Sequence, residues 1–154
     1  MESGQQMTQR GVLAVDEGTT GTRAAYVTED GSVGPISYVR LNVTSGPGGI
    51  VEQDAEEIRD RTIEMIRTAI RSAIADDVVI ESLGISTPRM PSVLWDSASG
   101  RALAPAIVWQ DTRYAAGVTT YGVEWNAFLV PRIGRTAGIP SPFLSAVHTV
   151  MQHP

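Results

Sequence analysis

The chain has 154 residues, of which 42% are hydrophobic and 19% charged, a composition typical of one soluble globular domain. The formal net charge of −5 argues against nucleic acid as a partner, because proteins that bind nucleic acid usually present a basic face. All 12 basic residues are arginine and there is no cysteine, which excludes a P-loop lysine, lysine Schiff bases, disulfides and thiolate zinc sites.

The N-terminus carries no recognisable targeting segment. The first ten residues are polar and lack the apolar region of a signal peptide, so we expect residues 1–10 to form a disordered tail. No apolar run approaches the roughly 20 residues that cross a membrane. We therefore expect a cytoplasmic protein with no membrane partner and one domain over residues 11–154.

Three strands are predicted to follow the tail as an antiparallel meander. The first is a continuous apolar run, which predicts a buried strand, and Gly18 and Gly21 permit the turn that follows it. The Asp-Gly pair in segment 29–32 supplies the positive φ of a hairpin turn. The predicted strands are Gly11–Asp16, Thr22–Thr28 and Val33–Val43.

A long amphipathic helix is predicted after a loop rich in glycine and proline at residues 44–50. Asp54 is a candidate N-cap, and Glu57 three residues later completes a capping-box pattern. The helix should run to about Ala75 with one buried face, because apolar residues recur at helical spacing. That face carries Ile58, Thr62, Met65, Ile66, Ala69, Ile70, Ala73 and Ile74.

The remainder predicts three more strands, a turn at residues 96–100, and three helices. The order strand–strand–strand–helix–strand predicts an α/β domain of the ribonuclease-H-like (actin-like ATPase) class, with a mixed sheet and inserted strands at 92–109. The predicted strands are Val78–Ser86, Ser92–Trp95 and Ala106–Trp109. The predicted helices are Asp111–Tyr121, Glu124–Arg132 and Phe143–Gln152.

The turn between the first two strands has the residues of a phosphate site. Asp16 ends a strand, where a carboxylate can hold a hydrated magnesium ion. Gly18 lets backbone amides approach a phosphate, and Thr19 and Thr20 offer hydroxyl and amide donors. Arg23 can neutralise phosphate charge with its fork of donors. The alternative is a plain hairpin with polar turn residues.

Five further segments are similar, in order and spacing, to motifs of the FGGY carbohydrate kinases, and most of all to those of the glycerol kinases in that family. Together with the first turn they extend the resemblance from about Gly11 to His153. The five segments are Gly46–Asp54, Leu83–Arg89, Val93–Asp96, Pro105–Arg113 and Gly138–Ala146.

The resemblance implies two actin-like domains that transfer the γ-phosphate of MgATP to a hydroxyl of a sugar or polyol, with ATP and Mg²⁺ as cofactors. It implies that Asp16 lies near the metal ion and that the turn and Arg23 lie near the phosphates. The implied acceptor-side residues are Arg89, Met90, Trp109, Asp111 and Phe143. Three of these have a plainer alternative: Arg89 as a surface cation, Trp109 as core packing, and Asp111 paired with Arg113 or capping the next helix.

Departures from the family pattern affect both sides of the implied site. Met90 stands where glycerol kinases carry an acidic residue, and Phe143 stands where they carry a tyrosine. A site built to pair hydroxyl groups discriminates strongly, so we expect a less polar pocket, for a different polyol, or a decayed one. Glu17 stands where glutamine is usual, which should add negative charge close to the phosphates.

The resemblance also implies a second kinase domain that holds the general base and the adenine-binding residues. We therefore expect no catalytic residue in this chain and no appreciable kinase activity from it alone, because phosphoryl transfer requires metal, phosphate and acceptor to be positioned together. The expected partners are a small sugar or polyol and that second domain. Whether the chain forms a homo-oligomer is left open by the sequence. The alternative function is a stand-alone, non-catalytic binding or regulatory module, or a decayed remnant of kinase ancestry.

Overall fold

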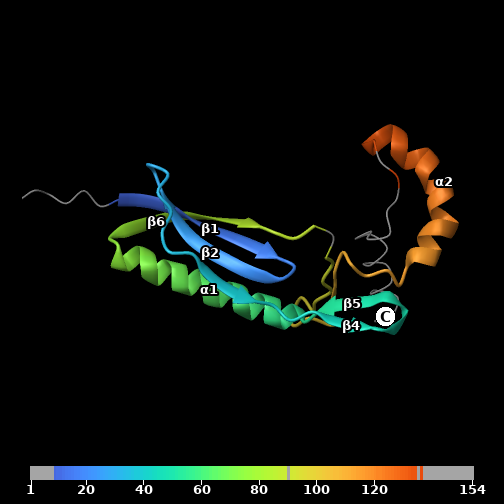
Figure 1. The fold of residues 1–154 in the computed structure, drawn as a ribbon, viewed down its shortest axis with the longest axis horizontal. Helices are drawn as coiled ribbons and strands as arrows, with labels where there is room; N and C mark the ends of the chain where they lie inside the picture. Colours follow the sequence, from blue (N-terminus) through green and yellow to red (C-terminus); the bar gives the residue numbers. More distant parts are fainter. Residues whose placement is uncertain (1–8, 90, 135, 137–154) are drawn as a thin grey trace, which may run out of the picture. The chain divides into compact units, whose positions relative to one another are not determined.

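The structure is a computed structural model that describes residues 9–89, 91–134 and 136 (Figure 1). The chain divides into two compact units. The first contains the residues up to Leu41 and Ile58–Pro88, and the second contains Asn42–Glu57 and the residues from Arg89 onward. None of the helices in the described ranges is long and apolar enough to cross a membrane.

The first unit is built on a four-stranded mixed sheet. Its strands are β1 (Gln9–Gly18), β2 (Gly21–Thr28), β3 (Ser37–Arg40) and β6 (Val78–Ser86). The strand order is β3-β2-β1-β6, in which β1 is antiparallel to β2 and parallel to β6, and β2 is antiparallel to β3. The predicted meander and the crossover to a parallel strand are confirmed, although β1 begins inside the predicted tail.

The third strand is shorter than predicted because the chain leaves the ladder after the hairpin turn. Val33 makes only an isolated bridge to Val27. Gly34 lies against the Tyr26 ring, where an added Cβ would lie 2.1 Å from ring atom Cε1. The ladder resumes only at Ser37, which pairs with Ala24 on β2.

Helix α1 (Ala55–Ala75) ends where the sequence predicts and begins at the predicted cap. The Asp54 carboxylate accepts hydrogen bonds from the amides of Glu56 and Glu57 at 2.8 and 3.4 Å, so the N-cap is confirmed. The Glu57 carboxylate accepts a hydrogen bond from the Asn42 side chain at 2.8 Å, which ties the first turn of the helix to the preceding loop.

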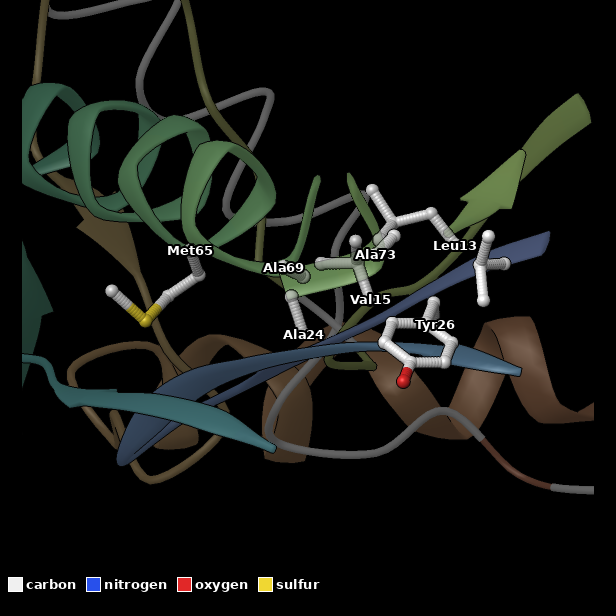
Figure 2. Packing of buried hydrophobic residues seen from close by; sticks show 8 residues of the cluster. Leu13, Val15, Ala24, Tyr26, Met65, Ala69 and Ala73 are labelled. Carbon is white, nitrogen blue, oxygen red and sulfur yellow. The ribbon is translucent and has the colours of Figure 1, made fainter. Parts of the chain in front are cut away.

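The core of the first unit lies between α1 and one face of the sheet (Figure 2). Ala69 and Ala73 are fully buried, and their small side chains let the helix backbone approach the strands closely. Ile70 and Ile74 were predicted on the buried face but are 36% and 69% exposed, so that face is narrower than the sequence suggested. The buried cluster consists of Leu13, Val15, Ala24, Tyr26, Met65, Ala69, Ala73 and Val78.

Strand β1 is buried on one face only, which corrects the prediction of a buried strand. Leu13 and Val15 are 2% and 3% exposed, whereas Val12 is 44% exposed. Successive side chains of a strand point to opposite faces. The residues of β1 that face α1 are therefore buried, and those that face the other way carry the exposed groups of the candidate site.

The second unit contains a small antiparallel sheet, of which the sequence predicted one strand. Its elements are β4 (Thr44–Gly46), the 3₁₀ turn η1 (Pro47–Gly49), β5 (Ile50–Gln53) and β7 (Ala106–Ile107). Glu52 on β5 pairs with Thr44 on β4 and with Ile107 on β7, which gives the order β4-β5-β7. Strand β4 lies in the segment predicted as a loop, and β5 begins at the last residue of that segment. Strand β7 confirms the first half of the predicted strand Ala106–Trp109.

The predicted strand at residues 92–95 is not a continuous strand. Ser92 and Trp95 make isolated bridges to Ile107 and Ala102. The predicted turn at 96–100 is confirmed, because the Asp96 carboxylate accepts hydrogen bonds from the Ser99 amide and hydroxyl at 2.7 and 2.6 Å.

A single helix, α2 (Ala115–Ile133), replaces the two predicted between residues 111 and 132. Its backbone continues through Gly122 and contains Pro131 in the last turn. It ends at Gly134, whose φ of +69° is left-handed and whose amide donates to the Val130 carbonyl at 3.0 Å. The helix predicted at Phe143–Gln152 lies outside the described residues.

Candidate functional site

The turn between β1 and β2 carries an exposed acid–base pair. Asp16 and Arg23 are partners in the β1–β2 ladder, and Arg23 Nη1 lies 3.3 Å from Asp16 Oδ2. Both side chains are about half exposed, and the Arg23 guanidinium carbon lies 4.9 Å from the centre of the Tyr38 ring. An exposed pair of this kind contributes little to stability, so both groups are available to a ligand.

The turn itself is tight, and there is no room for a side chain at Gly21, where β2 begins. Gly18 and Gly21 are ladder partners, and Thr19 and Thr20 make the turn between them. A Cβ on Gly21 would lie 2.5 Å from the Val39 carbonyl oxygen and from a Tyr38 ring carbon. Gly21 is therefore required by close approach to β3 rather than by a positive φ.

Glu17 points to the opposite face from Asp16. Its side chain is 7% exposed, and its Oε2 accepts hydrogen bonds of 2.6 Å from the hydroxyls of Thr22 and Thr62. This carboxylate ties the ends of β1 and β2 to α1 beneath the turn. The sequence predicted that Glu17 adds negative charge close to the phosphates. In the structure the Glu17 carboxylate instead points away from the Asp16 side and is paired with two threonine hydroxyls.

Trp109 is the exposed residue of an otherwise buried segment in the second unit. Ala106, Ile107 and Val108 are between 0% and 6% exposed, whereas Trp109 is 53% exposed. It lies in a turn closed by a 3.0 Å hydrogen bond from the Asp111 amide to the Val108 carbonyl. The alternative that Trp109 packs in the core is therefore wrong.

Asp111 and Arg113 pair with each other, as one interpretation of the sequence predicted. Arg113 Nε lies 2.9 Å from both carboxylate oxygens of Asp111, and Arg113 Nη2 lies 2.6 Å from Oδ2. Arg113 Nη2 also donates to Glu52 Oε1 at 2.7 Å. Sequence reasoning missed Glu52 because its partner lies 61 positions away, although both belong to motifs that the sequence analysis had marked.

The electrostatics of this pair keep both groups charged. Burial alone would raise the pKa of Asp111, but hydrogen bonds from the Arg113 guanidinium and the Val51 amide outweigh it, so the pKa lies below its ordinary value. The hydrogen bonds to Asp111 and Glu52 raise the pKa of Arg113 above its ordinary value despite burial. The pair is an ionised bridge at neutral pH.

Of the other three residues predicted on the acceptor side, the structure describes only Arg89. Arg89 is exposed and lies three positions after the end of β6, in the second unit, while Met90 and Phe143 lie outside the described residues. Among the residues that the structure describes, no three acidic or histidine side chains gather as a metal site. Asp16 fits a hydrated magnesium ion, which needs only one or two carboxylates together with water and phosphate oxygens.

A family model described as the FGGY family of carbohydrate kinases, N-terminal domain, matches residues 11–136. The chain is 39% identical over 137 residues to a glycerol kinase of Acinetobacter baylyi and 38% identical over 113 residues to one of Haloferax volcanii. These alignments cover 88% and 73% of this chain but 27% and 22% of the relatives. The chain therefore spans about a quarter of the length of the curated relatives that it matches.

Solved structures of similar fold include a glycerol kinase from Plasmodium falciparum with ADP, with a TM-score of 0.86 at 22% identity. A xylulose kinase from Rhodospirillum rubrum matches with a TM-score of 0.70 at 26% identity. The two matches cover 95% and 79% of this chain, and 29% and 25% of the other chains. The predicted fold class is confirmed by these likenesses.

Proposed function

Because the chain belongs to the FGGY family of carbohydrate kinases, we propose that it forms the N-terminal part of an enzyme that phosphorylates a sugar or polyol with MgATP. Glycerol is the first acceptor to test, since glycerol kinases are among the relatives. In the proposed reaction the acceptor oxygen bonds to the γ-phosphorus while the bond to the bridging oxygen of ADP breaks. The acceptor proton leaves to a base that we place outside this chain, and the cytoplasm supplies the ATP.

The observation that carries the proposal is the exposed Asp16–Arg23 pair beside the glycine turn. Phosphoryl transfer depends mainly on positioning and on neutralising phosphate charge. Arg23 can donate to phosphate oxygens, and Asp16 can hold the waters of a magnesium ion bound to the same phosphates. Thr19 and Thr20, in the turn between the ladder partners Gly18 and Gly21, can offer hydroxyl and amide donors to the same phosphates. On the acceptor side, the exposed Trp109 indole can cover the carbon chain of a polyol.

The proposal is tested by titrating the chain with MgADP and following backbone amide resonances by NMR. We expect the amides of residues 18–23 to move most. Arg23→Gln should weaken ADP binding with or without magnesium, whereas Asp16→Asn should remove mainly the magnesium-dependent part. Asp30→Asn, at an exposed hairpin turn of the same unit, is the matched control. Unchanged amides at the turn under saturating millimolar MgADP would exclude this phosphate site.

A further inference from the structure

The second unit holds an exposed indole on a backbone that is fixed from both sides. Before Trp109, the Val108 amide donates to the Val51 carbonyl at 3.3 Å. After it, the Thr112 amide donates to the Gly49 carbonyl at 2.8 Å. Gly49 has a φ of +82°, and an added Cβ would lie 2.1 Å from the Thr112 hydroxyl oxygen, so only glycine fits there. A large aromatic side chain is thus exposed on an ordered turn.

Asp111, at the end of that turn, has no acceptor capacity left for a ligand. Its Oδ1 accepts from the Arg113 amide at 3.0 Å and from Arg113 Nε at 2.9 Å. Its Oδ2 accepts from the Val51 amide at 2.7 Å and from Arg113 Nη2 at 2.6 Å. An ionised carboxylate offers about four lone-pair sites. All are used, and the side chain is 1% exposed, so a polyol hydroxyl has no oxygen to approach.

The guanidinium of Arg113 links this carboxylate to strand β5. Arg113 and Glu52 are 18% and 24% exposed, and the 2.7 Å contact between them lies on the strand that pairs with β7. Charge-assisted hydrogen bonds of this length are among the strong ones, and those to a planar fork also fix orientation. The bridge therefore holds the turn against β5 at two points, through the guanidinium and through the Val51 amide.

We propose that Glu52, Arg113 and Asp111 form a clamp that positions Trp109 for its acceptor, and that Asp111 acts through the indole rather than by touching the acceptor. The clamp fixes the backbone on which the indole stands, so the indole meets the acceptor in one orientation. This inference rests on the proposed function only for the nature of the ligand. The ordering of Trp109 by the clamp can be measured without any ligand.

The test uses the chain with Trp109 as the sole tryptophan, obtained by Trp95→Phe and Trp125→Phe. Both replaced indoles are exposed, at 60% and 49%, so their loss leaves the core intact. Acrylamide quenching and fluorescence anisotropy of Trp109 are compared between this parent and Asp111→Asn, well below the unfolding temperature. We expect quenching to rise about twofold and anisotropy to fall, because removing the clamp permits local opening.

Two further variants keep the result interpretable. Arg113→Lys retains the charge but not the fork, so we expect a smaller change in the same direction; it also carries the test if Asp111→Asn does not fold. Asp96→Asn is the matched control, since Asp96 also fixes a turn of this unit through a backbone amide but does not bond the Trp109 turn. Parent-like quenching and anisotropy in both clamp variants, or an equal change in Asp96→Asn, would overturn the proposal.

A glycerol titration separates the clamp from the proposed function. If glycerol shifts Trp109 emission in the parent, Asp111→Asn should bind it about tenfold more weakly, the loss typical of one buried charged hydrogen bond. If glycerol leaves the parent unchanged while the clamp variants loosen Trp109, the clamp stands and glycerol as the Trp109 ligand fails. Weaker glycerol binding with unaltered ligand-free Trp109 signals would mean direct contact by Asp111, and the clamp proposal would fall.

Discussion

At the scale of single residues, two strand glycines of the first unit differ in what surrounds their missing side chain. A Cβ on Gly21 would lie 2.5 Å from the Val39 carbonyl oxygen, a backbone atom that can move only with β3. A Cβ on Gly84 would meet nothing within 4 Å. Both residues are glycines in strands, but only Gly84 has space for an added methyl group, so the same substitution can be compared at the two positions.

We predict that Gly21→Ala lowers the free energy of unfolding by about 1–3 kcal/mol, the range for overpacking a close contact. Gly84→Ala should change it by less than about 0.5 kcal/mol, because substitutions in open positions usually have small effects. Urea unfolding followed by circular dichroism measures both. Equal midpoints for the two variants would show that β3 moves aside without cost.

Single residues also show what the sequence could reveal about the site. Asp16 and Arg23 could be found from sequence because both flank one short turn, and the Asp111–Arg113 pair could be found because its members are two positions apart. The role of Glu52 could not, since it depends on β5 lying beside the turn after β7. Whether Trp109 is buried or exposed was equally open, because an indole at a strand end suits both.

At the scale of elements, Glu17 connects β1 and β2 to α1 through two threonine hydroxyls. It is a buried carboxylate, and each donor it loses leaves more of its charge without a partner. A buried group that loses a hydrogen-bond partner costs more than the bond itself contributed. The attachment of the helix to the sheet therefore depends on polar groups as well as on the apolar cluster above them.

We predict that Thr62→Val, which keeps the side-chain shape, destabilises the chain by about 1–3 kcal/mol because Glu17 loses one donor. Thr68→Val is the control in the same helix, since its hydroxyl bonds to the Glu64 carbonyl within α1. Thermal unfolding of both variants measures the difference. A Thr62→Val variant no less stable than Thr68→Val would contradict the structural role of Glu17.

Elements were predictable where local signals agreed. Strand β6 has the predicted bounds, and α1 begins at its aspartate cap. Strands β4 and β5 were missed because they have only three and four residues. Strand β7 was predicted within Ala106–Trp109, but its pairing with β5 was not, since it joins Glu52 to Ile107 across 55 positions. The one-sided burial of β1 was hidden because Val12 and Ala14 make its exposed face apolar too.

At the scale of the whole molecule, pH acts on stability through the carboxylates that the fold holds ionised. The pKa of Asp111 is lowered in the folded chain, so its contribution to stability is fully present above the ordinary carboxyl pKa of about 4 and is lost as the pH falls below that value. Asp30 and Asp96 have lowered pKa values for similar reasons, through bonds to Thr28 and Ser99.

We predict that Asp111→Asn is less stable than the parent chain at pH 7 and that the difference shrinks as the pH falls toward about 2.5, below the ordinary carboxyl pKa. Thermal unfolding of both proteins between these pH values measures this convergence. The acid sensitivity that remains in the variant belongs to the other carboxylates. A constant difference across the range would mean that Asp111 does not change its ionisation on unfolding.

The two neighbouring acids of β1 carry one last consequence. Asp16 faces solvent and Glu17 faces the helix, because successive side chains of a strand point to opposite faces of the sheet. Removing or adding one residue within β1 would exchange them, placing the buried carboxylate in the open and the exposed one under α1. The site at this turn therefore depends on the length of β1 as well as on its residues. Substitutions in β1 leave the two faces as they are, whereas insertions or deletions within the ladder keep them only when they involve an even number of residues.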